Sequence, residues 1–211
     1  MRKGLFSVLS SGLIVLALGI GTSTATATTA TTWTIKPGGT VTGATSKTVI
    51  TDTKTGTATT CTSSSLGATL KSGTGRKNPI GKITAFSYNS CTVIGLGAGI
   101  TTSASSTNPW LLRGKTYLNG VTHGTLGNIE TSFSITGPTG TCSGIVAGTS
   151  ATTPGQIKVT YKNVSGSVIM GGGNLHAWNV AGPCLGHINT GDPITVTGTY
   201  KISPRQTITS P

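Results

Sequence analysis

Hydrophobic and polar residues alternate along several stretches of the chain, which is the pattern of a β-strand with one buried face. The alternation is clearest over 156–161 and 194–202. In both stretches most of the alternate positions are Ile, Val or Tyr, and the positions between them are Thr, Lys or Gln. Less regular stretches of the same kind cover 47–53, 80–86, 121–126, 132–136, 164–170 and 175–180. We predict a strand in each of them.

Signals for helices are almost absent after the N-terminal segment. The chain has 43 threonines, which favour strands, and 32 glycines, which weaken helices. Turn pairs such as Asn119-Gly120 and Pro154-Gly155 separate the alternating stretches. These features predict an all-β fold, an antiparallel β-sandwich of Ig-like or related Greek-key topology, with little or no helix.

We expect one β domain over residues 33–203, and a division into two β subdomains stays open. A flexible Thr/Ala leader at 28–32 is expected to precede the domain, and a short tail at 204–211 to follow it. Residues 73–78, with Arg76 and Lys77, have the composition of a mobile basic loop.

The N-terminus has the features of a secretory signal peptide. Arg2 and Lys3 precede an apolar stretch over 5–20, and Ala25-Thr26-Ala27 supplies a small-x-small cleavage site. We predict a signal peptide over residues 1–27, with cleavage after Ala27 and Ala30 as the second choice. The apolar stretch is shorter than the roughly 20 residues that a membrane-spanning helix needs. A secreted protein is therefore expected, free outside the cell or associated with the cell wall.

Four cysteines follow the predicted cleavage site: Cys61, Cys91, Cys142 and Cys184. None belongs to a C-x-x-C pair, so a zinc site or a redox motif has no support. In an oxidising compartment four cysteines form two disulfides, and three pairings are possible. We favour Cys61–Cys91 with Cys142–Cys184, because each half of the chain then closes its own loop.

The sequence contains few residues suited to catalysis or metal binding. Only three carboxylates are present, which excludes most sites that need clustered acids. His123, Glu130 and Ser132 could form a hydrolase triad, but no G-x-S-x-G motif is present. A minimal metal set would need both of the later histidines and one acid: His176, His187 and Asp192. We expect neither site, and therefore no enzymatic activity, no metal and no cofactor.

The positive charge is the strongest functional feature. The formal net charge is +12, the isoelectric point is near 10.0, and removal of the signal peptide leaves +10. Two local groups stand out, and we predict that they bind a ligand: Arg76, Lys77 and Lys82 in one, Arg113 and Lys115 in the other. No motif for reading nucleic acid is present, so we expect no specific nucleic-acid partner.

Outside the cell, a basic surface meets anionic cell-wall polymers or acidic polysaccharides. The leading hypothesis is thus a monomeric, non-catalytic binding protein of the cell envelope or extracellular space. The other interpretation of the charge is that it only confers solubility. An alternative function is a small-ligand carrier with a pocket between the sheets. Trp110, after Asn108-Pro109, is a candidate ligand-binding residue, either as an exposed anchor or as a plug over the end of the sandwich.

Several local patterns together resemble a set of uncharacterised secreted proteins of actinobacteria. They include Cys61 to Leu70, Phe86 to Cys91, and Asn-Pro-Trp-Leu-Leu at 108–112. Gly-Asn-Leu at 173–175, the run at 182–193 around Cys184, and Gly-Thr-Tyr-Lys-Ile-Ser-Pro at 198–204 complete the set. The resemblance implies a signal peptide, two disulfides and a β-rich fold, and it implies no function or site residue.

Overall fold

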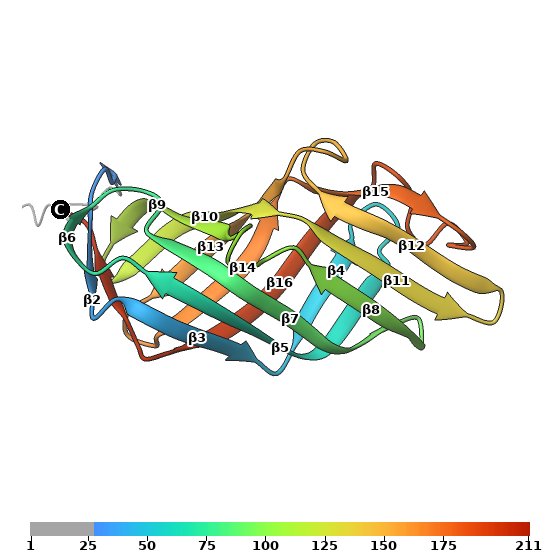
Figure 1. Ribbon diagram of the computed structural model, residues 1–211, viewed down its shortest axis with the longest axis horizontal. Coiled ribbons are helices and arrows are strands. Elements are labelled where there is room, and N and C mark those ends of the chain that lie inside the picture. Colours follow the sequence, from blue (N-terminus) through green and yellow to red (C-terminus); the bar gives the residue numbers. More distant parts are fainter. Residues whose placement is uncertain (1–27) are drawn as a thin grey trace, which may run out of the picture.

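The computed structural model describes residues 28–211, and the predicted signal peptide lies outside these residues. The described chain is all-β and antiparallel, as the sequence predicts, and forms an elongated molecule (Figure 1). Its strands are β1 (Thr28–Thr29), β2 (Trp33–Lys36), β3 (Gly39–Thr45), β4 (Thr48–Asp52), β5 (Ala58–Leu70), β6 (Gly73–Arg76), β7 (Gly81–Val93), β8 (Leu96–Thr102), β9 (Trp110–Leu118), β10 (Val121–Ile129), β11 (Thr131–Gly137), β12 (Gly140–Ala147), β13 (Gly155–Lys162), β14 (Ser167–Gly173), β15 (Leu175–Ala181), β16 (Pro193–Ser203) and β17 (Thr207–Thr209).

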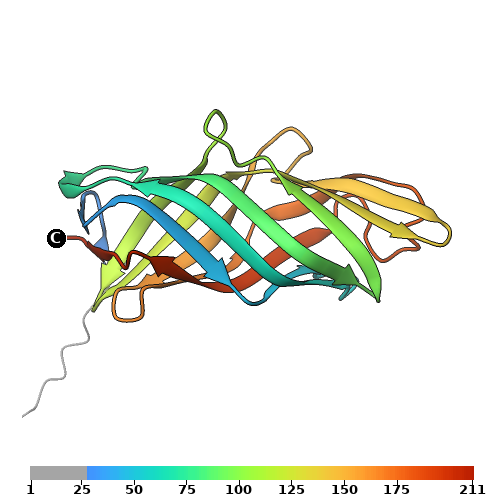
Figure 2. The same cartoon turned by 60° about the horizontal axis from the view of Figure 1, so that its bottom comes forward.

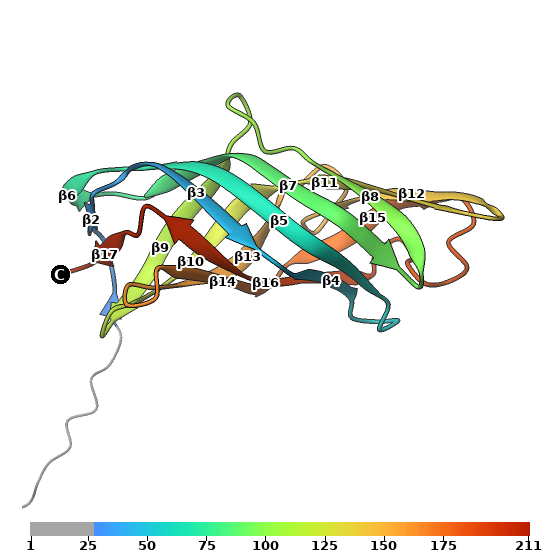
Figure 3. The ribbon, with the colours of Figure 1, turned by 90° about the horizontal axis from the view of Figure 1, so that it is seen from below.

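Two sheets are present, and the larger one closes on itself twice. One ring of hydrogen-bonded neighbours runs β9–β10–β13–β14–β16–β3–β5–β7 and returns to β9. The other runs β16–β15–β12–β11–β8–β7–β5–β4 and returns to β16. The strands run obliquely around the long axis (Figure 2). The long strands β5 and β7, together with β16, belong to both rings and join the two halves of the molecule (Figure 3).

The smaller sheet, β17–β2–β6, covers one end of the molecule, where the C-terminus lies (Figure 1). Trp33 and Ile35 of β2 are fully buried, and Ile208 of β17 is nearly so. The ring of Trp33 lies directly over Gly114 of β9, where an added Cβ would come within 2.3 Å of it. Glycine at this position therefore allows the tryptophan to seal the end.

This end of the molecule corrects three expectations from the sequence. The expected mobile loop at 73–78 contains β6, which pairs with β2. The expected tail at 204–211 contains β17, and the expected leader contains β1, which pairs with β9. Each segment supplies only two to four strand residues. Such lengths are too short for alternation to be visible, and pairing with distant strands orders them.

The core is one apolar cluster that extends through both halves. A buried polar contact connects β4, β5 and β16 within it. The Tyr200 hydroxyl lies 2.7 Å from Ser64 Oγ and 3.0 Å from Thr48 Oγ1, and these two oxygens are 2.6 Å apart. Burial raises the pKa of Tyr200. The three hydroxyls satisfy one another, which allows polar side chains at positions that face the interior.

Both disulfides form in the favoured pairing. Cys61–Cys91 joins facing positions of β5 and β7, and Cys142–Cys184 joins β12 to the segment after β15. Two disulfides are consistent with an exported protein. Within residues 28–211, no helix has the length and apolar character needed to cross a membrane.

Candidate functional site

Charged side chains are distributed unevenly along the molecule. Strands β8, β11, β12 and β15, which form the end opposite the C-terminus, contain no Lys, Arg, Asp or Glu (Figure 1). The two predicted basic groups lie in the other half, on β6, β7 and β9 and the connection between β6 and β7. The structure therefore concentrates these basic residues in one half.

Strand pairing brings residues from both basic groups onto one outer surface. Lys82 of β7 pairs with Leu111 of β9, and Arg113 lies two residues further along the same face. Diagonal neighbours of this kind lie roughly 7–8 Å apart. Arg113 faces Thr125 of β10, which in turn faces Lys158 of β13. The three basic side chains are exposed and form a row across four adjacent strands.

Lys115 joins this row through a β-bulge in β9. It is the extra residue between the pairs Gly114–Gly124 and Thr116–His123. A bulge changes the direction of a side chain and bends the strand. A Cβ at Gly124 would lie 2.2 Å from the backbone of β9, so the close approach of the two strands here requires glycine. Lys115 is exposed and points to the same outer surface.

Asn78 holds the connection between β6 and β7 against this surface. Its Nδ2 donates to the Gly114 carbonyl oxygen at 2.7 Å, and its Oδ1 accepts from the Gly114 amide at 2.9 Å. The backbone of Lys77, the residue before Asn78, is therefore held near β9, and its side chain is exposed. Lys71 adds a further ammonium nearby, because its Nζ donates to the Lys77 carbonyl oxygen at 2.7 Å.

Arg76, the fifth predicted residue, belongs to the end sheet. It pairs with Trp33, and its Nε donates to the Ser72 carbonyl oxygen. It is exposed at the edge of the region rather than in the row. We define the basic face as Lys77, Lys82, Arg113, Lys115 and Lys158.

A groove of about 590 Å³ lies beside the bulge, over β9, β10 and β13. Lys115, His123 and Lys158 line it, and the Nδ1 of His123 lies 3.1 Å from Thr160 Oγ1. Lys158 faces a glycine of β14, so no side chain fills the space beside it. Residues with hydroxyl and amide groups also line it, beside Ile157 and Val159: Thr116, Thr125, Gln156, Thr160 and Asn174. Ammonium groups among hydroxyls and amides suit a ligand that carries both acidic groups and hydroxyls.

No carboxylate neutralises the basic face. Glu130 lies five residues beyond Thr125, which corresponds to about 16 Å along a strand. Asp52 and Asp192 are buried, and Lys54 pairs with Asp192 in the only salt bridge within residues 28–211. No Asp or Glu side chain therefore reduces the positive potential of the face, which solvent ions screen.

Trp110 does not lie on this surface. Its side chain is 1% exposed, stacks on Phe86 with ring centroids 5.2 Å apart, and donates from Nε1 to Ser103 Oγ at 3.1 Å. An exposed anchor is therefore excluded, and only a ligand inside the molecule could touch the ring. The two interior cavities measure about 50 and 60 Å³, whereas small-molecule sites usually measure about 300–1,000 Å³. Within residues 28–211, neither interior cavity is large enough for the pocket between sheets that a small-ligand carrier would need.

The two sets considered for catalysis and metal binding do not assemble. His123 and Glu130 are seven residues apart on or just after one strand, which separates them by about 23 Å. His176 Nδ1 contacts the Asn174 carbonyl oxygen at 3.1 Å. Among residues 28–211, no three His, Cys, Asp or Glu side chains come together as metal ligands would.

Sequence reasoning missed Lys71, Asn78 and Lys158. Lys158 lies within the clearly alternating stretch at 156–161, and its outward position was predictable. Its proximity to Arg113 depends on the register of three strands, which no local pattern encodes.

Comparison with known proteins gives no match: no family model fits this chain, and no curated protein or solved structure matches it.

Proposed function

We propose that this protein is a secreted, non-catalytic binding protein that attaches to anionic polymers of the cell envelope, such as wall polymers or acidic polysaccharides. The observation that carries the proposal is the convergence of the basic face on adjacent strands with no carboxylate beside it. Scattered charges would serve solubility equally well. A row of ammonium and guanidinium groups spaced along a surface suits a chain with repeated negative charges.

The groove supports the same proposal. It continues the basic face through Lys115 and Lys158 and adds hydroxyl and amide groups. A polymer with sugar or polyol units could place its acidic groups on the lysines and its hydroxyls in the groove. On this proposal Lys82 and Arg113 make the electrostatic contacts and the groove positions one repeating unit.

The test is retention of the mature protein on isolated cell walls over a series of salt concentrations. We expect retention at low salt and steep release as salt rises, because exposed charges are screened. The double variant Arg113→Gln/Lys115→Gln should be released at lower salt than the wild type. Lys47→Gln/Lys201→Gln is the matched control, since it removes the same charge from the β3–β4 turn and β16.

The proposal fails if both double variants lose retention equally, because net charge alone would then explain binding. It also fails if the wild type is not retained at any salt, or if its retention does not depend on salt.

A further inference from the structure

A lysine and two aspartates meet where the β4–β5 turn contacts the segment that precedes β16. Lys54 Nζ lies 2.9 Å from Asp192 Oδ1, and Asp52 lies two residues before Lys54. Two of the three carboxylates of the whole sequence are therefore at one place. The basic face does not involve any of these residues.

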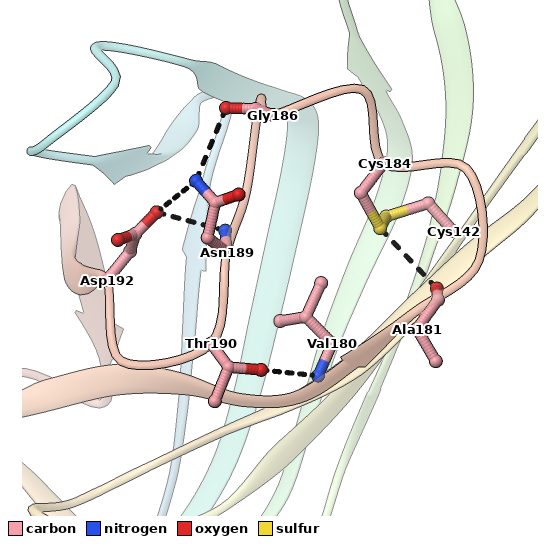
Figure 4. Close-up of a disulfide and its surroundings, with 8 residues drawn as sticks. All are labelled: Cys142, Val180, Ala181, Cys184, Gly186, Asn189, Thr190 and Asp192. Atoms are coloured by element: carbon pink, nitrogen blue, oxygen red, sulfur yellow. Dashed lines mark hydrogen bonds between the residues drawn. A yellow bond between two sulfur atoms is a disulfide. The ribbon is translucent and has the colours of Figure 1, made fainter.

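Asp192 is held rigidly in a buried position. Its side chain is 0% exposed, and its Oδ2 accepts from the Asn189 amide at 2.9 Å and from Asn189 Nδ2 at 2.8 Å (Figure 4). The same segment is joined to β12 by the Cys142–Cys184 disulfide (Figure 4). The Asp192 carboxyl group is therefore held in place with Oδ1 toward the Lys54 amine.

Asp52 supplies a second, incompletely bonded carboxyl group. It is 2% exposed, and its Oδ1 accepts from the backbone amides of Lys54 at 2.9 Å and Thr55 at 3.0 Å. Its Oδ2 is buried without a hydrogen-bond donor, and Asp52 pairs with Ile194, two residues after Asp192.

We propose that Lys54 and Asp192 are joined by an intramolecular isopeptide bond, and that Asp52 is the proton-transfer group of the reaction. The Lys54 ammonium first gives a proton to the Asp192 carboxylate. The neutral Nζ then attacks Cγ of Asp192, and the C–N bond forms. Asp52 accepts a proton from the nitrogen and returns one to the departing oxygen, and the C–O bond breaks. One ammonium and one carboxylate become one amide and one water, with no change in oxidation state.

The geometry favours this reaction in two ways. Nζ is already hydrogen-bonded to the carboxyl group whose carbon it must attack, and holding two reacting groups together raises their effective concentration. The Lys54 side chain is 68% exposed, so the released water can reach solvent.

One feature makes the reaction slow. Burial raises the pKa of Asp192, but hydrogen bonds from Lys54 and Asn189 outweigh it and hold this pKa below its ordinary value. The first proton transfer is therefore uphill. We expect a single, gradual turnover in each molecule, which ties the β4–β5 turn to a residue 138 positions away.

Intact-mass measurement of the disulfide-reduced mature protein tests the proposal. The wild type, after prolonged incubation, should be lighter than its sequence by one water molecule. A branched tryptic peptide should join Lys54 to Asp192. Lys54→Arg keeps the ion pair but cannot form this amide, so it should have its full sequence mass. Lys47→Arg, on the neighbouring turn, is the matched control and should lose water like the wild type.

Asp52→Asn should slow the mass loss at least tenfold if it folds. A wild type that keeps its full mass overturns the proposal and leaves an ion pair only. Loss of water in Lys54→Arg overturns it as well, because the dehydration would then lie elsewhere.

Discussion

Replacement of Asn78 by Ala tests whether the arrangement of the basic face matters, because it changes no charge. The Asn78 side chain makes two hydrogen bonds to Gly114, at 2.7 and 2.9 Å, and these hold Lys77 beside β9. Each such bond contributes about 0.5–1.5 kcal/mol, so their loss weakens the attachment by about 1–3 kcal/mol. At about 2 kcal/mol, the detached form of the segment becomes roughly 30 times more populated relative to the attached form.

The expected consequence is weaker binding to a polyanion. With Lys77 no longer held beside the rest of the basic face, the slope of the logarithm of the association constant against the logarithm of the salt concentration should fall by up to about 0.9. This is the value for one lost contact with a dense polyanion. The assay is titration of long-chain polyphosphate at several salt concentrations. Asn89→Ala is the control, since Asn89 is an exposed residue of β7 and the substitution also keeps the charge. Equal affinity and slope for the wild type and a folded Asn78→Ala would refute the reasoning.

Three further predictions concern stability. Tyr200→Phe removes two buried hydrogen bonds and should lower the free energy of unfolding by about 1–3 kcal/mol in urea titrations; an unchanged midpoint would contradict the buried contact. Burial raises the pKa of Tyr88, Tyr161 and Tyr200 above the ordinary value in the folded state. As the pH rises, the unfolded chain therefore loses these protons before the folded protein does. The contribution of the three tyrosines to the free energy of unfolding is fully present below about pH 10 and should decrease above it. A flat stability profile between pH 9 and pH 11 would argue against this. Replacing Cys142 and Cys184 together by Ser opens a loop of 42 residues and should cost about 4 kcal/mol, checked by the same titration against the wild type.

Alternation of hydrophobic and polar residues predicts strands best where it is regular. The two clearest stretches, 156–161 and 194–202, correspond to β13 and β16. The longest missed strand is β5, which is rich in Ser, Thr and Gly. Its inward positions include Ser64, which is 1% exposed and satisfied by hydroxyls of β4 and β16. A polar residue at an interior position breaks the pattern, and its partners lie 16 and 136 positions away. Local sequence therefore could not identify this strand.

The double closure of the large sheet was not predictable for a related reason. It depends on pairings between distant strands, such as β7 with β9 and β16 with β3. Alternation tells which face of a strand is buried but not which strand lies beside it. The same limit applies to the basic face. Exposure of Lys82, Arg113 and Lys158 follows from their positions in strands, and their adjacency follows from register alone.

The distribution of charge, rather than its total, should decide what this surface binds. At physiological ionic strength the screening length is about 8 Å, so a basic residue far from the face adds little to the potential there. The four uncharged strands at the opposite end contribute nothing, and the buried Asp192 already neutralises Lys54. What a polymer meets is therefore the row across β7, β9, β10 and β13 with the groove beside it. A net charge of the same size spread evenly over the molecule would bind a polymer more weakly. Arg113→Gln/Lys115→Gln and Lys47→Gln/Lys201→Gln remove equal charge, so comparing them separates binding through the basic face from an effect of net charge alone.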